Sequence, residues 1–109
     1  MTGVDDLAMI WTGLNAQSGW TRSNANIVAA YTSGPGNGTY SFNATQGSYT
    51  PFRIVFGQAQ GGAIFLMSIT NPAGATVATA STTFSQDIVQ YGCSSANNAP
   101  AFAQWGQET

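Results

Sequence analysis

The first apolar pattern in the chain predicts a short N-terminal helix over residues 4–14. Four apolar side chains recur at the helical positions i, i+3, i+4 and i+7: Leu7, Ile10, Trp11 and Leu14. Asp5 and Asp6 stand at the start of this segment, where the positive end of a helix dipole favours negative charge. The pattern therefore indicates a helix with one apolar face.

From the glycine-rich segment 33–38 onward, the pattern changes to a period of two. Tyr40 and Phe42 fall on one face of an alternating stretch. Residues 52–56 alternate as a half-buried strand does. Residues 26–31, just before this change, fit either a strand or about one and a half helical turns, and the pattern leaves both open.

The clearest local structure that the sequence predicts is a β-hairpin. Residues 63–70 form a near-continuous apolar run, which is typical of a central strand buried on both faces. Residues 71–74 read Asn-Pro-Ala-Gly, which suits the first, second and fourth positions of a type I turn. Residues 75–84 then form the return strand. Further short strands are predicted over 87–91 and 101–105.

Short strands separated by turn residues predict a mainly β fold. We expect an antiparallel β-sandwich, of jelly-roll or immunoglobulin-like type, or a small barrel, with a short N-terminal helical segment. The length of 109 residues indicates a single domain. Within it, residues 1–32 are expected to form a helical and irregular arm, and residues 38–105 the β body.

The scarcity of charge excludes several classes of function. Two basic residues, four acidic residues and no His give a formal net charge of −2. Nucleic acids and anionic membranes need clusters of basic side chains, so neither is an expected partner. The chain has no His to act as a general base. Both basic residues are Arg, so it also has no Lys for Schiff-base chemistry. We therefore expect no enzyme.

Individual chemical motifs add little to this picture. Cys93 has no His or Lys to lower the pKa of its thiol, so we interpret it as a small apolar filler. No calcium-binding loop motif occurs, so no metal-binding residue is predicted, although a bound structural ion stays open. No catalytic or cofactor-binding residue is predicted either. The glycosylation motifs at Asn37 and Asn43 are interpreted as chance matches, because the N-terminus lacks a secretion-signal pattern.

The leading functional hypothesis is a non-enzymatic structural protein of a large symmetric assembly. Uncharged surfaces cost less desolvation free energy than charged ones when they are buried against other proteins, and interface centres contain few charged residues. The partners would be a coat lattice or further copies of this chain, as for a capsid decoration protein of a virus or phage. Such a protein would lie in a virion or other extracellular particle, made in the cytoplasm without a signal peptide. The expected interface residues are Leu7, Ile10, Trp11, Leu14 and Arg22.

The alternative hypothesis is a carbohydrate-binding module or lectin on the same fold. Sugar sites place an aromatic face against the apolar side of a pyranose and use amides for its hydroxyls, and neither partner carries charge. The chain combines Trp and Tyr with many Asn and Gln residues. The ligand-binding residues expected under this hypothesis are Trp20, Tyr49, Tyr91 and Trp105.

Overall fold

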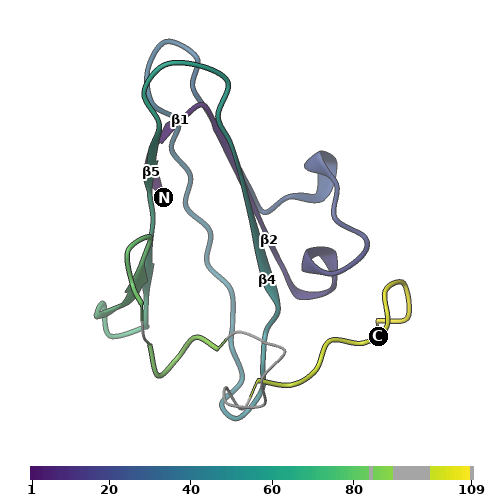
Figure 1. Cartoon of the computed structure of the whole chain (residues 1–109). Helices are drawn as coiled ribbons and strands as arrows, with labels where there is room; N and C mark the ends of the chain where they lie inside the picture. Colours follow the sequence, from purple (N-terminus) through teal and green to yellow (C-terminus); the bar gives the residue numbers. More distant parts are fainter. Residues whose placement is uncertain (84, 90–98, 109) are drawn as a thin grey trace.

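The structure, a computed structural model, describes residues 1–83, 85–89 and 99–108 (Figure 1). It is mainly β, as the sequence predicts. The strands are β1 (Thr2–Asp5), β2 (Leu7–Thr12), β3 (Ile27–Ala30), β4 (Phe52–Gly57), β5 (Ile64–Leu66), β6 (Ser68–Thr70) and β7 (Thr76–Thr79). Two short 3-10 helices lie between β2 and β3: η1 (Gly13–Ala16) and η2 (Arg22–Asn24).

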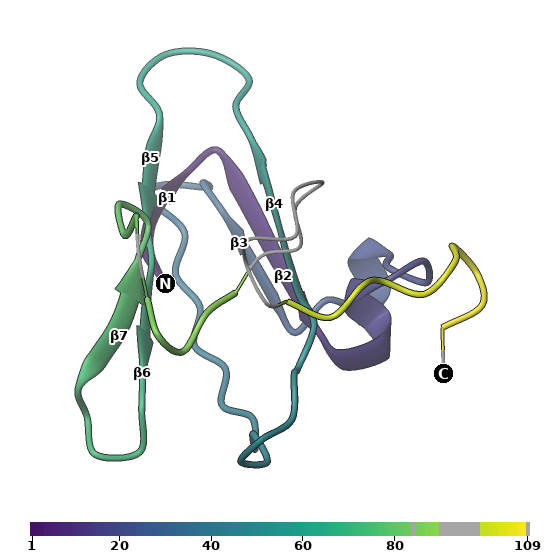
Figure 2. The same ribbon diagram turned by 60° about the horizontal axis from the view of Figure 1, so that its bottom comes forward.

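The strands form three antiparallel sheets. The largest has the order β3-β2-β4, with Met9 of β2 opposite Val28 on one side and Val55 on the other. β1 pairs with β5, and β6 pairs with β7. Figures 1 and 2 show β5 and β1 on one side of the molecule and β2 and β4 on the other. Strands from the first thirty residues therefore pair with strands from residues 52–66.

The helix predicted over residues 4–14 is not formed, and this segment contains β1 and β2 instead. All five residues from Leu7 to Trp11 are apolar, so three of the four positions of the helical pattern lie in one continuous apolar run. Their spacing therefore does not distinguish a helix from a strand. A short apolar run fits a buried strand as well as a buried helix. Pairing on both edges of β2 decides in favour of the strand. The first helical turn, η1, begins only after Thr12.

β4 confirms the strand predicted over residues 52–56. Residues 26–31, which the sequence left open between strand and helix, contain the strand β3. The predicted hairpin is confirmed in shorter form as β6 and β7. Its turn is closed by the Gly74 N–H, which donates to the Asn71 carbonyl at 2.9 Å.

The remaining strand predictions are wrong where the structure describes the residues. The apolar run 63–70 is divided into β5 and β6, and its side chains are exposed or half-buried rather than buried on both faces. Residues 39–42, 87–89 and 101–105 form no strand, and positions 90 and 91 lie outside the described residues. Apolar alternation without a neighbouring strand to pair with does not produce a sheet.

The core of the molecule is small and centred on the N-terminal strands. Val4, Ala8 and Ala29 are buried together, with Phe65 of β5 packed against them. Trp11 is fully buried as well, beside the helical turns that follow β2. The N-terminal strands thus carry the side chains that join the β1–β5 pair to the larger sheet.

Candidate functional site

Three segments meet at the junction between β1 and β2. The Oδ2 atom of Asp6 accepts a hydrogen bond of 2.5 Å from the backbone N–H of Ala59. The Asp6 carbonyl accepts a second one, of 2.6 Å, from the N–H of Tyr31. The peptide bond between Asp5 and Asp6 is cis. We call the region formed by Asp5, Asp6, Tyr31 and the loop 58–62 the loop end.

The loop that follows Tyr31 is fixed to β1 by backbone pairing. The Val4 N–H donates to the Gly36 carbonyl at 2.9 Å, and the Gly36 N–H donates to the Val4 carbonyl at 2.8 Å. Gly36 is buried, and an added Cβ would lie 2.5 Å from the Ala30 nitrogen. This close approach of two backbones requires glycine at position 36 and sets where Tyr31 lies.

The loop 58–62 is shaped by one glutamine side chain. The Nε2 atom of Gln58 lies 3.0 Å from the Gln60 carbonyl and 3.3 Å from the Gly62 carbonyl, as a donor to both. Gly61 has a φ of 82°, which only glycine adopts without strain. The loop therefore folds back on itself and presents its residues beside Asp6.

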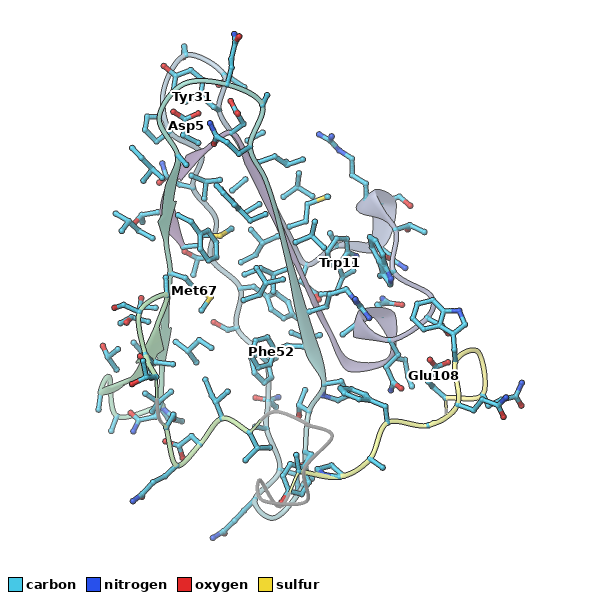
Figure 3. All side chains as sticks on the ribbon, in the orientation of Figure 1. Asp5, Trp11, Tyr31, Phe52, Met67 and Glu108 are labelled. Carbon is cyan, nitrogen blue, oxygen red and sulfur yellow. The ribbon has the colours of Figure 1, made fainter. Side chains whose placement is uncertain are left out.

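The loop end gathers chemistry that suits a polar, uncharged ligand. Tyr31 is 47% exposed, and Figure 3 shows it at the same end of the molecule as Asp5. Carboxylate oxygens accept hydrogen bonds from hydroxyl groups, and bonds to an ionised acceptor are stronger than neutral ones. Arg22 in η2 and Arg53 against η1 lie toward the opposite end of β2. The loop end is therefore acidic, and anions are disfavoured there.

The acidic pair also changes the titration of Asp5. Desolvation raises the pKa of Asp5 above its ordinary value of 3.8, and the hydrogen bond and charge of neighbouring Asp6 raise this pKa further. The stability that protonated Asp5 contributes is present below 3.8 and is lost as pH rises through the folded pKa. Ionised Asp5 thus costs the fold stability at neutral pH.

We expect Asp5→Asn to raise the melting temperature at neutral pH and to flatten its fall between acidic and neutral pH. Thermal unfolding followed by circular dichroism over that range checks this. Glu108→Gln is the matched control with the opposite sign, because the Ser18 hydroxyl lowers the pKa of Glu108 below its ordinary value of 4.5. A lower melting temperature for Asp5→Asn at neutral pH would contradict the prediction.

A cluster of aromatic rings lies beside η1 and η2. The Trp11 indole N–H lies 2.7 Å from the Thr21 carbonyl and 2.9 Å from Asn24 Oδ1. The Trp20 ring meets Trp11 edge-on at a centroid distance of 5.4 Å. The Arg53 guanidinium lies 5.2 Å from the centroid of the Trp20 ring, and its Nε donates to the Ala16 carbonyl at 2.7 Å. These contacts hold the turns of η1 and η2 against the sheet.

The five residues predicted as an interface do not form one stripe. Trp11 is fully buried and presents no surface to a partner. Leu7 and Trp11 point to one face of β2 and Ile10 to the other, because side chains alternate along a strand. Leu14 is 58% exposed in η1, and Arg22 is exposed in η2. The structure places these residues on three different elements, β2, η1 and η2.

The residues predicted for sugar binding belong to separate segments of the chain, and the Ser18 hydroxyl, which donates to Glu108 at 2.6 Å, joins the segment before Trp20 to the tail that carries Trp105. Trp20 packs against Trp11 and Arg53, and retains 38% exposure. Tyr49 is 56% exposed in the irregular segment before β4, and Trp105 is 65% exposed in the C-terminal tail. Tyr91 lies outside the described residues. None of the ring contacts found for Trp20 involves the other members of this set.

Tyr31 and the pair of Asp5 and Asp6 were not predicted as site residues. The helix prediction placed the two carboxylates at a helix start, which hid their place at a loop junction. Turn residues at 33–38 and 58–62 were the available signal, because binding residues are often carried on loops that a sheet positions. A near-parallel pair of exposed rings, Tyr40 and Phe42, lies 6.2 Å apart between centroids in another loop.

Two absences hold for the described part of the chain. No group of three or more His, Cys, Asp or Glu side chains gathers there as a metal site. Within residues 1–83, 85–89 and 99–108, no helix has the length and apolar character needed to cross a bilayer.

Comparison with known proteins gives a family match. The family model described as the GLEYA domain matches residues 1–71, which include the whole loop end. No curated protein matches the chain. No solved structure matches it either.

Proposed function

We propose, from the premise that this chain belongs to the GLEYA domain family, that it is a non-enzymatic carbohydrate-binding protein. The GLEYA domain is a yeast adhesin-like domain, which relates to the hypothesis of a lectin. The family match over residues 1–71 is the observation that carries this proposal. The binding site that we propose is the loop end, because every residue of it lies within the matched part.

The loop end has the two kinds of contact that a sugar requires. The exposed ring of Tyr31 offers an apolar face to the C–H groups of a pyranose. The carboxylates of Asp5 and Asp6 accept hydrogen bonds from hydroxyl groups. Ligand sites combine an apolar surface with a few fixed polar groups in this way. The negative charge favours neutral sugars over sialylated, sulfated or uronic ones.

The hypothesis of an assembly protein was based on low charge, and low charge serves the proposed function equally. A surface of hydroxyls and amides suits neutral ligands as well as neighbouring subunits. The family match favours sugar binding, and nothing in it relates to a coat lattice. We propose further that the opposed sheets belong to a β-sandwich, whose loops at one end carry the site.

A glycan array followed by calorimetry tests the proposal. The chain should bind neutral oligosaccharides and should bind their sialylated or sulfated forms more weakly. Tyr31→Ala should weaken binding about tenfold or more, which corresponds to about 1.4 kcal/mol. Both measurements are made with added calcium and with a chelator, because carboxylate oxygens are ordinary calcium ligands.

Tyr40→Ala is the matched control, because it removes an exposed tyrosine ring from a different loop. Its affinity should equal that of the wild type. Binding to no glycan overturns the proposed function. In a second contrary outcome, sugar binding survives Tyr31→Ala and is lost in Trp20→Ala or Trp105→Ala. That result overturns the loop end as the binding site and favours the residues predicted from the sequence.

A further inference from the structure

The structure distinguishes the two glycosylation motifs that the sequence contains. The motif at Asn37 belongs to the loop that is paired with β1. Asn37 Oδ1 accepts a hydrogen bond of 3.1 Å from the Gly3 N–H, and its Nδ2 lies 3.4 Å from the Pro35 carbonyl. Gly38, the next residue, donates its N–H to the Met1 carbonyl at 3.0 Å. Asn37 is itself exposed, but its amide oxygen ties the loop to the N-terminal strand.

The motif at Asn43 has a different setting. Asn43 lies in residues 41–49, which are exposed throughout. Within the described residues, its side-chain amide makes no hydrogen bond. The motif is followed directly by a turn, in which the Ser48 N–H donates to the Thr45 carbonyl at 3.0 Å. A large substituent on Asn43 Nδ2 would extend into solvent without disturbing a contact of the fold.

The geometry points to Asn43 as an N-glycan acceptor that the folded chain accommodates, and to Asn37 as a motif that it leaves unmodified. In this step, Asn43 Nδ2 forms a bond to the anomeric carbon of a lipid-linked oligosaccharide diphosphate. The bond from that carbon to the diphosphate oxygen breaks, and the lipid diphosphate leaves with the electron pair. The amide proton passes to a base of the oligosaccharide transferase. A glycan on Asn37 Nδ2 would instead crowd the contact of this atom with the Pro35 carbonyl, in the loop that Asn37 Oδ1 fixes to Gly3.

This inference concerns the surface that the protein presents, and it does not rest on sugar binding at the loop end. The sequence led us to interpret both motifs as chance matches. The inference changes that interpretation for Asn43 and keeps it for Asn37. The contrast comes from the hydrogen bonds of the two amides, since the two tripeptides meet the same sequence rule, Asn followed by any residue but Pro and then Ser or Thr.

The test is secretion of the full chain from yeast behind a secretion leader, followed by intact mass measurement and peptide mapping. Thr45→Ala and Thr39→Ala are the matched variants, because each destroys one motif and keeps its asparagine. We expect one N-glycan on the wild type, its complete loss in Thr45→Ala, and its retention in Thr39→Ala. Treatment with an amide-cleaving glycosidase should convert position 43 to aspartate.

An unmodified secreted chain overturns the inference. So does a glycan at Asn37, alone or together with one at Asn43. Because glycan mass is measured without any sugar ligand, failure here leaves the glycan-array result unaffected, and failure on the array leaves the glycan mass unaffected.

Discussion

Replacing Trp11 by alanine is expected to lower the free energy of unfolding by about 3–5 kcal/mol. Trp11 is the largest fully buried side chain of the described residues, and its indole N–H donates to both the Thr21 carbonyl and Asn24 Oδ1. Alanine leaves a cavity beside β2 and removes the edge contact with the Trp20 ring. Domains of this size are stable by about 5–15 kcal/mol, so the variant should be largely unfolded when warmed modestly.

Urea unfolding measured by circular dichroism tests this expectation, with two companion variants. Trp11→Phe keeps an aromatic ring but removes the indole N–H from two acceptors, each of which still accepts one backbone N–H. The lost hydrogen bond should cost about 0.5–1.5 kcal/mol. Trp105→Ala removes a tryptophan that is 65% exposed and should change stability by no more than about 0.5 kcal/mol. Equal losses for Trp11→Ala and Trp105→Ala would show that burial of Trp11 does not stabilise the fold as described.

Gly36→Ala is the second large effect that we expect. The new methyl carbon would lie 2.5 Å from the Ala30 nitrogen, 2.7 Å from its oxygen and 2.8 Å from the Ala29 carbonyl carbon. These are backbone atoms of β3 and cannot move aside as a flexible side chain can. Overpacking of this kind costs about 1–3 kcal/mol and can cost more. The displaced loop should also move Tyr31, so sugar binding at the loop end should fall.

Gly34→Ala is the control on the same loop, since an added Cβ at that position meets no atom within 4 Å. Melting temperature and glycan affinity are measured for both variants. Gly34→Ala should match the wild type in both measurements. If Gly36→Ala also matches the wild type, the close pairing of this loop with Val4 is not as the structure has it.

The sequence was most informative where local chemistry decides the structure. The turn at residues 71–74 was predictable because Asn71, Pro72 and Gly74 each favour one position of a type I turn. β4 was predictable because apolar and other residues alternate from Phe52 to Phe56. Residues 7–12 were not predictable in this way. Their run of apolar side chains fits helix and strand alike, and only pairing with segments far along the chain separates the two.

The candidate site depends on contacts of the same long-range kind. The combination of aromatic rings and amides in the composition indicates sugar chemistry as an alternative, but it does not indicate which rings take part. Asp6 meets Ala59 across a separation of 53 residues, and no local pattern encodes that contact. Tyr31 was therefore not among the predicted residues, and Trp20, whose ring packs against Arg53, stays a prediction.

The division of the strands into three sheets has a consequence for how the molecule opens. β2 lies between two partners, so each of its amide protons becomes accessible only when β3 or β4 separates from it. β6 and β7 form a two-stranded sheet of their own, and such pairs are marginal in water by themselves. Local unfolding should therefore begin at this hairpin. Proteases and exchanging deuterium would reach residues 68–79 long before they reach the strand that carries Trp11.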